Sequence, residues 1–513
     1  MVQIRQRSSV AASNSGGIED SPEFLPSEKP KSQTYDDFCS TNKLFVLCLA
    51  FRFANALLLQ TYFNPDEHWQ ALEVAHRIAF GYGHLTWEWK RGIRSYFHPL
   101  PFACLYKLLA ILGLDTPLFM IKAPRLLESI FSAAGDFYFY KLSSALFGDY
   151  VAKWALFSQL TNWFMFFCFN RTLSNSLETV LTLVSLYYWP CIRVSPTRSS
   201  KVSRKMALFM AALSCAIRPT SAITWLYVGM LELFSARDRL RFIFLEAAPI
   251  GSLVLGITFL LDRLMYGSWG FTAMLFSFIP FSISGIISSK KWKLTGLVIW
   301  VLGVHSLLGH KEFRFVLPIL PIALMFSGYS LAALRYPASP NGKREKSRDV
   351  HSKCPMKMKL AVIFLLATNI PMGLYMSLVH QRGTEDVMNH LAKEAVSEKV
   401  KSILFLMPCH STPYYSTLHR NLPMRFLDCT PSEETEIPVD SDRFLTNPLD
   451  FASEFAKNWT VPSHIVLFES EERPLKDFLK SHSFKEDKRF FHAHFKVDRD
   501  LQSSVVLYVL TNQ

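Results

Sequence analysis

Two adjacent carboxylates, Asp66 and Glu67, stand near the start of a polar segment, residues 62–98, that follows an apolar block. A carboxylate at the edge of a hydrocarbon layer is costly and is by default a functional candidate. A positioned carboxylate can act as a general base and take the proton of an attacking hydroxyl group. The alternative is that acids and tryptophans here mark a membrane interface, where aromatic belts are common.

A compact, mainly cationic block interrupts apolar sequence further along the chain, at His310-Lys311-Glu312-Phe313-Arg314. Cations held at such a place can bind an anion such as a phosphate group and stabilise charge that develops on it. His310, Lys311 and Arg314 are therefore candidate phosphate ligands. The alternative is that these side chains end a helix and extend toward water, with Glu312 paired to a neighbour.

The remaining candidates are more scattered. Arg94 lies within the segment 62–98. Arg171 precedes an apolar block with Asn175 and Glu178 near the same helix face, a pattern that packing and capping also produce. Four histidines of the polar segment have spacings of 8, 8 and 14, which match no compact zinc pattern, so the sequence does not favour a metal site. They are His68, His76, His84 and His98.

The composition explains which elements carry these residues. Half of the 513 residues are hydrophobic and 19% are charged, whereas a soluble protein usually has roughly 25% charged residues. Several apolar blocks approach the roughly 20 residues needed to cross a membrane. They are 44–61, 119–146, 151–169, 175–190, 206–234, 243–262, 271–288, 294–309, 315–335 and 360–379. The expected fold is an all-α, multi-pass membrane protein with about 10–12 transmembrane helices, preceded by a disordered polar tail, 1–43.

Basic residues between these blocks indicate the orientation. They gather in 191–205, 237–241, 289–293 and 335–359, and loops of this kind remain cytoplasmic. The net charge of +13 therefore reports orientation and does not point to nucleic acid. The alternation of sides requires that block 206–234 break at Arg218-Pro219, because proline disrupts a helix. The N-terminus is then cytoplasmic, and residues 62–98, the turn at Arg218, 310–314 and everything after 380 share the opposite side.

Two segments are expected to lie beside the membrane. Trp69, Leu72 and Ala75 recur at helical spacing, which predicts an amphipathic helix on the membrane surface. The apolar stretch 99–118 fits the alternation of sides only as a re-entrant or juxtamembrane helix.

The tail, residues 381–513, is too long and too polar for a loop. Short apolar runs at 402–406, 464–468 and 504–510 are typical of strands and alternate with helical stretches, which predicts a small α/β domain. Asn458 begins a glycosylation sequon, Asn-Trp-Thr. Cys409 and Cys429 would form a disulfide if the domain lies in an oxidising lumen.

Together these segments resemble the mannosyltransferases of glycosyltransferase family 22, in the GT-C superfamily of multi-pass enzymes. The resemblance covers about 40–380, so we take 44–380 as one transferase domain. Its motifs are Asn64-Pro65-Asp66-Glu67-His68-Trp69-Gln70, Thr86-Trp87-Glu88-Trp89, Arg94-Ser95-Tyr96, Arg171-Thr172-Leu173-Ser174-Asn175 and His310-Lys311-Glu312-Phe313-Arg314-Phe315. It implies a luminal active site in the endoplasmic reticulum membrane, an α1,2-linked mannose, dolichyl phosphate mannose as donor among the membrane lipids, and neither cofactor nor metal.

Two tail motifs narrow the expected function. His380-Gln381-Arg382-Gly383-Thr384 and Met407-Pro408-Cys409-His410 are similar to segments of family members that add the third mannose to the glycosylphosphatidylinositol (GPI) anchor precursor. The chain is thus expected to act on that glycolipid. One alternative keeps the family but makes the lipid-linked N-glycan precursor the acceptor. Another is a non-catalytic membrane scaffold or a transporter, since ionisable residues near spans also mark ion paths.

The resemblance and the residues together assign roles in an inverting single displacement. A phosphate leaving group needs no general acid, so Asp66 alone deprotonates the acceptor hydroxyl, while Glu67 orients the acceptor or positions Asp66. The cations that bind the departing phosphate and the substrates are Lys311, Arg314, His310, Arg94 and Arg171. Trp87 and Trp89 either stack on sugar faces or belong to the interface belt.

The sequence departs from the family pattern after Tyr266-Gly267-Ser268-Trp269. The family has a luminal loop of some tens of residues here, whereas Trp269 runs directly into the next apolar block. We expect the topology to survive and the activity to be reduced or lost.

Overall fold

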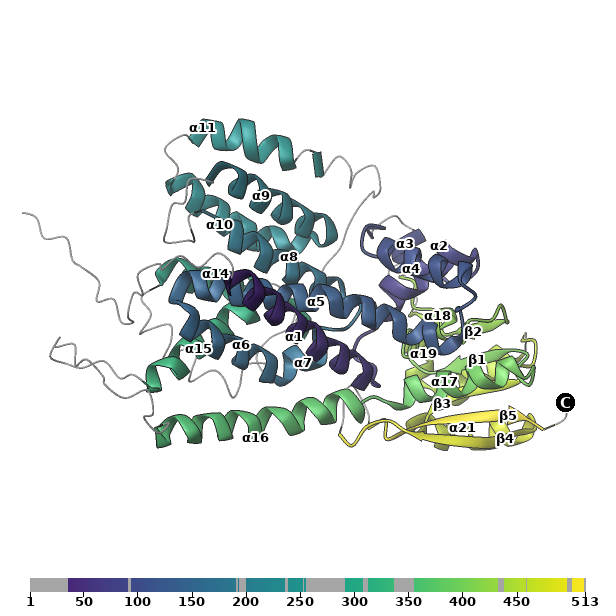
Figure 1. Cartoon of the computed structure of the whole chain (residues 1–513). Helices are drawn as coiled ribbons and strands as arrows, with labels where there is room; N and C mark the ends of the chain where they lie inside the picture. Colours follow the sequence, from purple (N-terminus) through teal and green to yellow (C-terminus); the bar gives the residue numbers. More distant parts are fainter. Residues whose placement is uncertain are drawn as a thin grey trace, which may run out of the picture.

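The structure is a computed structural model that describes residues 36–90, 94–190, 192, 200–235, 239–251, 253–254, 291–307, 312–335, 355–431, 438–457, 459–495 and 501–511. Figure 1 shows a bundle of helices and, beside it, a smaller unit of strands and helices formed by the C-terminal residues. The long helix α16 (Met356–Leu378) leads from the first part to the second.

The apolar blocks of the sequence form the helices of the bundle. These are α1 (Asp36–Leu58), α5 (Pro117–Phe147), α6 (Asp149–Thr161), α7 (Trp163–Cys168), α8 (Ser174–Tyr188), α9 (Ser200–Ile217), α10 (Ala222–Ser235), α11 (Arg239–Arg241), η3 (Phe242–Ala247), α14 (Trp292–Leu307) and α15 (Leu320–Arg335). Helix α1 begins within the tail that was expected to be disordered, so the expectation for residues 36–43 is wrong. The predicted span 243–262 is described only as far as residue 254, with a gap at 252, and the predicted span 271–288 lies outside the described residues.

The predicted break at Arg218-Pro219 is confirmed. Helix α9 ends at Ile217, and a 3-10 turn, Pro219–Ser221, separates it from α10. A second break divides the predicted span 151–169 at Asn162, whose side chain accepts a hydrogen bond from the N–H of Met165 and begins α7. An asparagine at this position satisfies a backbone donor that the helix start leaves open.

Among the described residues, one helical stretch, Met356–Val396, is long and apolar enough to cross a membrane on length and composition alone. Other predicted spans are short, such as α8 with 15 residues and α14 with 16, or carry charges. In α1 and α5 the charges pair, since Arg52 donates to both oxygens of Asp136, at 2.6 and 2.9 Å, and both side chains are buried. Ionisable groups in membrane helices usually pair in this way and face the interior of the bundle.

The C-terminal residues form one five-stranded sheet in the order β2-β1-β3-β5-β4. The strands are β1 (Ile403–Leu406), β2 (Met424–Phe426), β3 (His464–Phe468), β4 (Phe484–Phe491) and β5 (Ser504–Leu510). Strand β1 runs parallel to β2 and β3, whereas β5 is antiparallel to β3 and β4. Helix α17 (Gly383–Val396) packs on one face, and α20 (Pro448–Ala456) and α21 (Glu469–Ser481) pack on the other.

All three predicted strands are observed as β1, β3 and β5. Strand β2 has only three residues, and β4 is an edge strand whose sequence, FKEDKRFF, exposes most of its side chains. Neither gives an apolar run, so sequence pattern alone does not reveal them. Charged residues on an edge strand also discourage pairing with other chains.

The segment 62–98 packs on this sheet unit. It contains a π-helical turn (His68–Leu72), α2 (Glu73–Phe80) and α3 (Trp87–Lys90), and is followed by α4 (Leu100–Ile111). The expected surface position of the amphipathic helix is wrong, because Leu72 and Ala75 are buried against Phe102 of α4. Helix α4 lies in the apolar stretch 99–118, for which a re-entrant or juxtamembrane helix was predicted, and its Ile111 side chain is 75% exposed.

Several side chains join the segment 62–98 to the C-terminal unit, among them Trp69 and Glu73. Trp69 enters the core beneath the sheet, stacks on Tyr414 with ring centres 5.0 Å apart, and donates from Nε1 to the carbonyl of Thr412 at 2.8 Å. Glu73 accepts hydrogen bonds from the backbone N–H groups of Tyr414 and Ser416, at 3.2 and 2.9 Å. Segments more than 300 residues apart in the sequence therefore fold as one body.

Candidate functional site

Asp66 lies where arginines from separate parts of the chain converge. The Nη1 atom of Arg314, in the 3-10 turn Phe313–Val316, is 2.5 Å from Oδ2 of Asp66. The Nη1 atom of Arg94 is 3.9 Å from the same oxygen, and the charge of Arg218 also acts on it. The predicted carboxylate and two of the predicted cations are thus brought together across about 250 residues of sequence.

Asn64 fixes the geometry of this cluster. Its side-chain oxygen accepts one hydrogen bond from the backbone N–H of Asp66, at 3.0 Å, and another from Nη1 of Arg314, at 2.6 Å. An asparagine that bonds to the backbone two residues on stabilises a local turn. Glu312 accepts from Nη2 of Arg314 at 2.8 Å, so the guanidinium group is held between two carboxylates.

The arginines keep Asp66 ionised. Burial by itself raises the pKa of Asp66, but the charges of Arg314, Arg94 and Arg218 outweigh this effect, so the pKa lies below its ordinary value of 3.8. The side chain retains 15% of its exposed surface. The site therefore offers an accessible carboxylate next to cations, which suits a hydroxyl group and a phosphate that react with each other.

Glu67 is buried directly beneath this cluster. Nη1 of Arg171 lies 2.9 and 3.0 Å from its two carboxylate oxygens, and the N–H of Phe63 donates to Oε1 at 3.0 Å. Arg171 also donates to the carbonyl of Thr61, at 2.7 Å. Because Glu67 is only 1% exposed, it does not reach an acceptor, and its geometry fits the alternative of positioning Asp66.

Arg171 does not lie among the substrate cations. It is fully buried, and its guanidinium group is bonded to Glu67, Thr61 and Phe167. The expectation that it binds substrate is corrected: it supports the turn that carries Asp66.

A second buried ion network links the site to the C-terminal unit. Glu385, in the first turn of α17, accepts from Nη2 of Arg125 in α5 at 2.7 Å and contacts Nε2 of His68 at 3.1 Å. Burial alone would raise the pKa of Glu385, but Arg125 and His68 outweigh it and lower that pKa to about 2. The segments that carry Arg125, Glu385 and His68 therefore meet here, and His68 directly follows Glu67.

The two predicted tryptophans have different environments. Trp89 is buried and donates from Nε1 to the side-chain oxygen of Gln70 at 2.6 Å, so its ring does not offer a face to a sugar. Trp87 is half-buried and lines a cavity of about 300 Å³. His310, Lys311 and Asn458 lie outside the described residues.

The sequence analysis missed Arg218 and Asn64 as members of the site. Arg218 donates to Ser174 at 3.0 Å and to Asn175 at 3.1 Å, and its Nε lies 3.3 Å from Glu178. The available signal was the Arg218-Pro219 break, whose turn was predicted to face the same side as Asp66. For Asn64 the signal was its place two residues before a candidate base.

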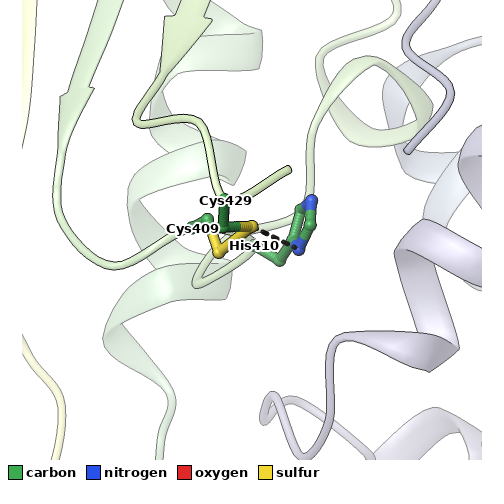
Figure 2. A group of neighbouring side chains, drawn as sticks. All are labelled: Cys409, His410 and Cys429. Carbon is green, nitrogen blue, oxygen red and sulfur yellow. Dashed lines mark hydrogen bonds between the residues drawn. A yellow bond between two sulfur atoms is a disulfide. The ribbon is translucent and has the colours of Figure 1, made fainter. Parts of the chain in front are cut away.

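In the described residues, three groups of side chains bring potential metal ligands within 4.8 Å of one another. In one of them Cys409 and Cys429 form a disulfide, with His410 beside them, so the sulfurs are not available as thiolates (Figure 2). In the second, Glu67 is paired with Arg171 and Glu385 with Arg125, and His68 contacts Glu385. The third, His390 with Glu394 and Asp487, lies far along the C-terminal unit and includes none of the site residues.

Comparison with known proteins identifies the family. Residues 43–278 and 270–419 match the model of the Alg9-like mannosyltransferase family. The chain belongs to this family. It is accordingly a glycosyltransferase, and the predicted membership of family 22 is confirmed.

Individual relatives of this mannosyltransferase agree with that assignment. The chain is 60% identical to Mannosyltransferase APTG1 of Arabidopsis thaliana, over 100% of both chains. It is 36% identical to GPI alpha-1,2-mannosyltransferase 3 of Homo sapiens, over 94% of this chain and 90% of that protein. The crystal structure of ArnT from Cupriavidus metallidurans in the apo state superposes with a TM-score of 0.54 at 10% identity, covering 92% of this chain and 98% of that one. This likeness shows that the chain shares the fold of ArnT.

We predict that the Glu67–Arg171 pair is essential for stability. Glu67→Ala would leave a buried guanidinium group without its carboxylate, which typically costs roughly 3–5 kcal/mol. The matched control is Glu454→Ala, which removes an exposed partner of Arg443 and should cost about 0–1 kcal/mol. Thermal unfolding of the purified protein in detergent measures both. Equal shifts of the two midpoints would contradict the role assigned to Glu67.

Proposed function

We propose that this mannosyltransferase transfers an α1,2-linked mannose, the third of the GPI anchor, from dolichyl phosphate mannose to the GPI precursor. The proposal is carried by Asp66, an ionised and accessible carboxylate held 2.5 Å from a guanidinium nitrogen of Arg314. It is supported by relatives named GPI alpha-1,2-mannosyltransferase 3 at 34–36% identity. A protein of the same fold, ArnT, has been crystallised bound to undecaprenyl phosphate, which supports a lipid phosphate as donor.

In the proposed reaction the acceptor hydroxyl attacks the anomeric carbon of the mannosyl phosphate from the side opposite the phosphate. The new carbon–oxygen bond forms as the bond to the phosphate oxygen breaks, and Asp66 takes the hydroxyl proton. The phosphate leaves as an anion, which Arg314, Arg94 and the block around Lys311 stabilise. No cofactor is needed, because the phosphate is already a good leaving group.

Arg314 couples donor binding to the strength of the base. In the structure its guanidinium group lowers the pKa of Asp66. When a donor phosphate draws this positive charge toward itself, the pKa of Asp66 rises toward its ordinary value, and the carboxylate becomes a stronger base. Deprotonation of the acceptor is therefore favoured once the donor is in place.

The proposed setting is the endoplasmic reticulum membrane, crossed by about 10–12 helices, with a cytoplasmic N-terminus and a luminal C-terminal unit. The Cys409–Cys429 disulfide supports a luminal location, because such bonds persist in oxidising compartments and are rare in the cytosol. The exposed apolar side chains of α4 and α16, including Ile111 and Ile363, support contact with lipid.

The segment after Trp269 bears on activity. The match to the family model falls into two pieces that meet at residues 270–278. The alignment with the Arabidopsis relative spans 548 positions, more than the 513 residues of this chain, so that relative has residues that this chain lacks. We place the missing residues after Trp269, in a part of the chain outside the described residues.

We predict that inserting the corresponding Arabidopsis segment after Trp269 raises mannose transfer at equal expression, because a wall of the luminal site is restored. The measurement is recovery of GPI-anchored surface proteins in cells that lack the enzyme. Equal recovery by the chain without the insertion, at normal expression, would show that the segment is dispensable.

We predict that Asp66→Asn lowers transfer about 10²–10⁴-fold, the usual contribution of a general base, while leaving expression and insertion unchanged. The assay uses microsomes, dolichyl phosphate mannose and a dimannosyl GPI precursor, with the variant made both with and without the inserted segment. Asp149→Asn, at the exposed start of α6, is the matched control. Undiminished transfer by Asp66→Asn would refute the assigned base, and transfer only to the lipid-linked N-glycan precursor would refute the proposed acceptor.

The pH profile provides a separate test. In Arg314→Gln the nearest positive charge is lost, so the pKa of Asp66 rises. Because the base must be ionised, the acid limb of kcat/KM should move to higher pH, whereas the alkaline limb stays in place. Arg443→Gln, remote from the site, is the control. An acid limb that does not move would mean that Asp66 is not the titrating base.

A further inference from the structure

A cavity of about 300 Å³ lies between the segment 62–98 and the C-terminal unit. His84, Thr86 and Trp87 line it from the first segment, and residues from 410 to 440 line it from the second. In Figure 1 the helix α3, which begins at Trp87, lies above the part of the C-terminal unit that contains β2 and α18. The cavity therefore forms only when the two segments have folded together.

The lining combines aromatic rings with carboxylates. Trp87, Tyr414 and Phe426 provide rings, and Asp428 and Asp440 provide acceptor oxygens. Small-molecule sites typically combine aromatic walls with a few polar groups, and about 300 Å³ is at the lower end of their range. Sugars suit such a lining, because their C–H faces pack on rings and their hydroxyl groups donate to carboxylates.

The cavity lies next to the catalytic cluster. Trp87 precedes Glu88, whose Oε1 accepts from Nη2 of Arg94 at 2.9 Å, and Arg94 faces Asp66. From the other side, the carbonyl of His410 accepts a hydrogen bond from the hydroxyl of Tyr62 at 2.5 Å, four residues before Asp66.

The electrostatic environment of the His410 imidazole also indicates that the cavity lies near Asp66. Burial and then the neighbouring His84 lower the pKa of His410 to about 4, while the charges of Asp66 and Asp428 act in the opposite direction. The carboxylate of the catalytic cluster and a carboxylate of the cavity thus influence one ring. At neutral pH that ring is uncharged, so the acidic character of the cavity is not neutralised by His410.

The far wall of the cavity is cross-linked and packed from behind. The disulfide between Cys409 and Cys429 joins the two chain segments that form the far wall (Figure 2). Trp69 packs behind that wall, with its ring centre 4.4 Å from His410 and 5.0 Å from Phe426. A preformed site of this kind does not need to be ordered when a ligand binds.

The charge of the lining distinguishes between the two substrates. Asp428 and Asp440 repel a phosphate, and Arg425, which also lines the cavity, has its guanidinium group 4.1 Å from the ring centre of Phe455. In the proposed reaction the donor phosphate binds instead to the arginines beside Asp66. The ligand class that fits the cavity is therefore a hydroxyl-rich sugar without a phosphate.

We propose that this cavity binds the sugar chain of the acceptor glycolipid and positions its terminal mannose against Asp66. The assignment rests on the proposed function and adds the residues that recognise the acceptor. It gives the C-terminal unit a direct part in substrate binding, with Trp87 stacking on a sugar ring and Asp428 accepting its hydroxyl groups.

The test measures equilibrium binding to the full chain in lipid nanodiscs, so it does not depend on turnover. The probes are a fluorescent dimannosyl GPI precursor, its lipid-free glycan as competitor, and dolichyl phosphate mannose. Trp87→Ala should raise the Kd for the GPI precursor at least about tenfold, and Asp428→Asn roughly fivefold. The Kd for dolichyl phosphate mannose should not change, and Trp87→Tyr should restore most of the binding.

The control is Asp477→Asn, in a separate hollow of about 550 Å³ between α20 and α21 that contains no site residue. Melting curves followed by near-ultraviolet circular dichroism or tryptophan fluorescence establish that each variant is folded. If the unaltered protein binds the GPI precursor and both cavity variants bind it equally well, the assignment is overturned. If the unaltered protein binds dolichyl phosphate mannose but not the GPI precursor, the proposed function is overturned instead. Loss of donor binding in the cavity variants would reassign the cavity to the donor.

Discussion

The active-site architecture depends on the buried contact between Glu67 and Arg171. The residue that is expected to react, Asp66, lies in the first turn of a helical stretch that continues through His68–Leu72 into α2. The neighbouring Glu67 anchors that turn from below, because Arg171 binds its carboxylate and also the carbonyl of Thr61. Arg125 donates to the carbonyl of Leu59 just before this turn. The buried arginines thus fix a short stretch of backbone, while the side chain of Asp66, which is 15% exposed, remains available.

The charge cluster at the site consists of three arginines and four carboxylates. Arg314, Arg94 and Arg218 act on the single carboxylate of Asp66, and Glu312, Glu88 and Glu178 each bind one of them. Each arginine therefore has its own counter-ion besides Asp66. A phosphate that enters this cluster meets guanidinium groups that are already oriented, which is the preorganisation that stabilises a developing anion most effectively.

Much of this arrangement followed from local sequence. The break at Arg218-Pro219 was predictable because proline has a fixed backbone requirement, and strands β1, β3 and β5 were predictable because they are continuous apolar runs. Asp66, Arg94 and Arg314 were recognised by residue type and by their place at the ends of apolar blocks. The burial of Arg171 and Trp89 was not predictable, since it results from contacts with Thr61 and Gln70 that no local sequence pattern encodes. The predicted position of α2 was also wrong, because an apolar helix face has the same sequence pattern whether lipid or protein covers it.

The insertion of Trp69 into the core of the C-terminal unit has a consequence for biosynthesis. A ribosome makes Trp69 early, but the strands around its binding site come last, and β5, between β3 and β4, ends at Leu510. Until then the partners of the tryptophan side chain at residues 410–426 belong to a sheet that lacks its central strand β5. The enzyme must therefore remain unassembled through nearly all of its own translation, and a chain cut short before β5 would carry every motif of the transferase domain without a completed site.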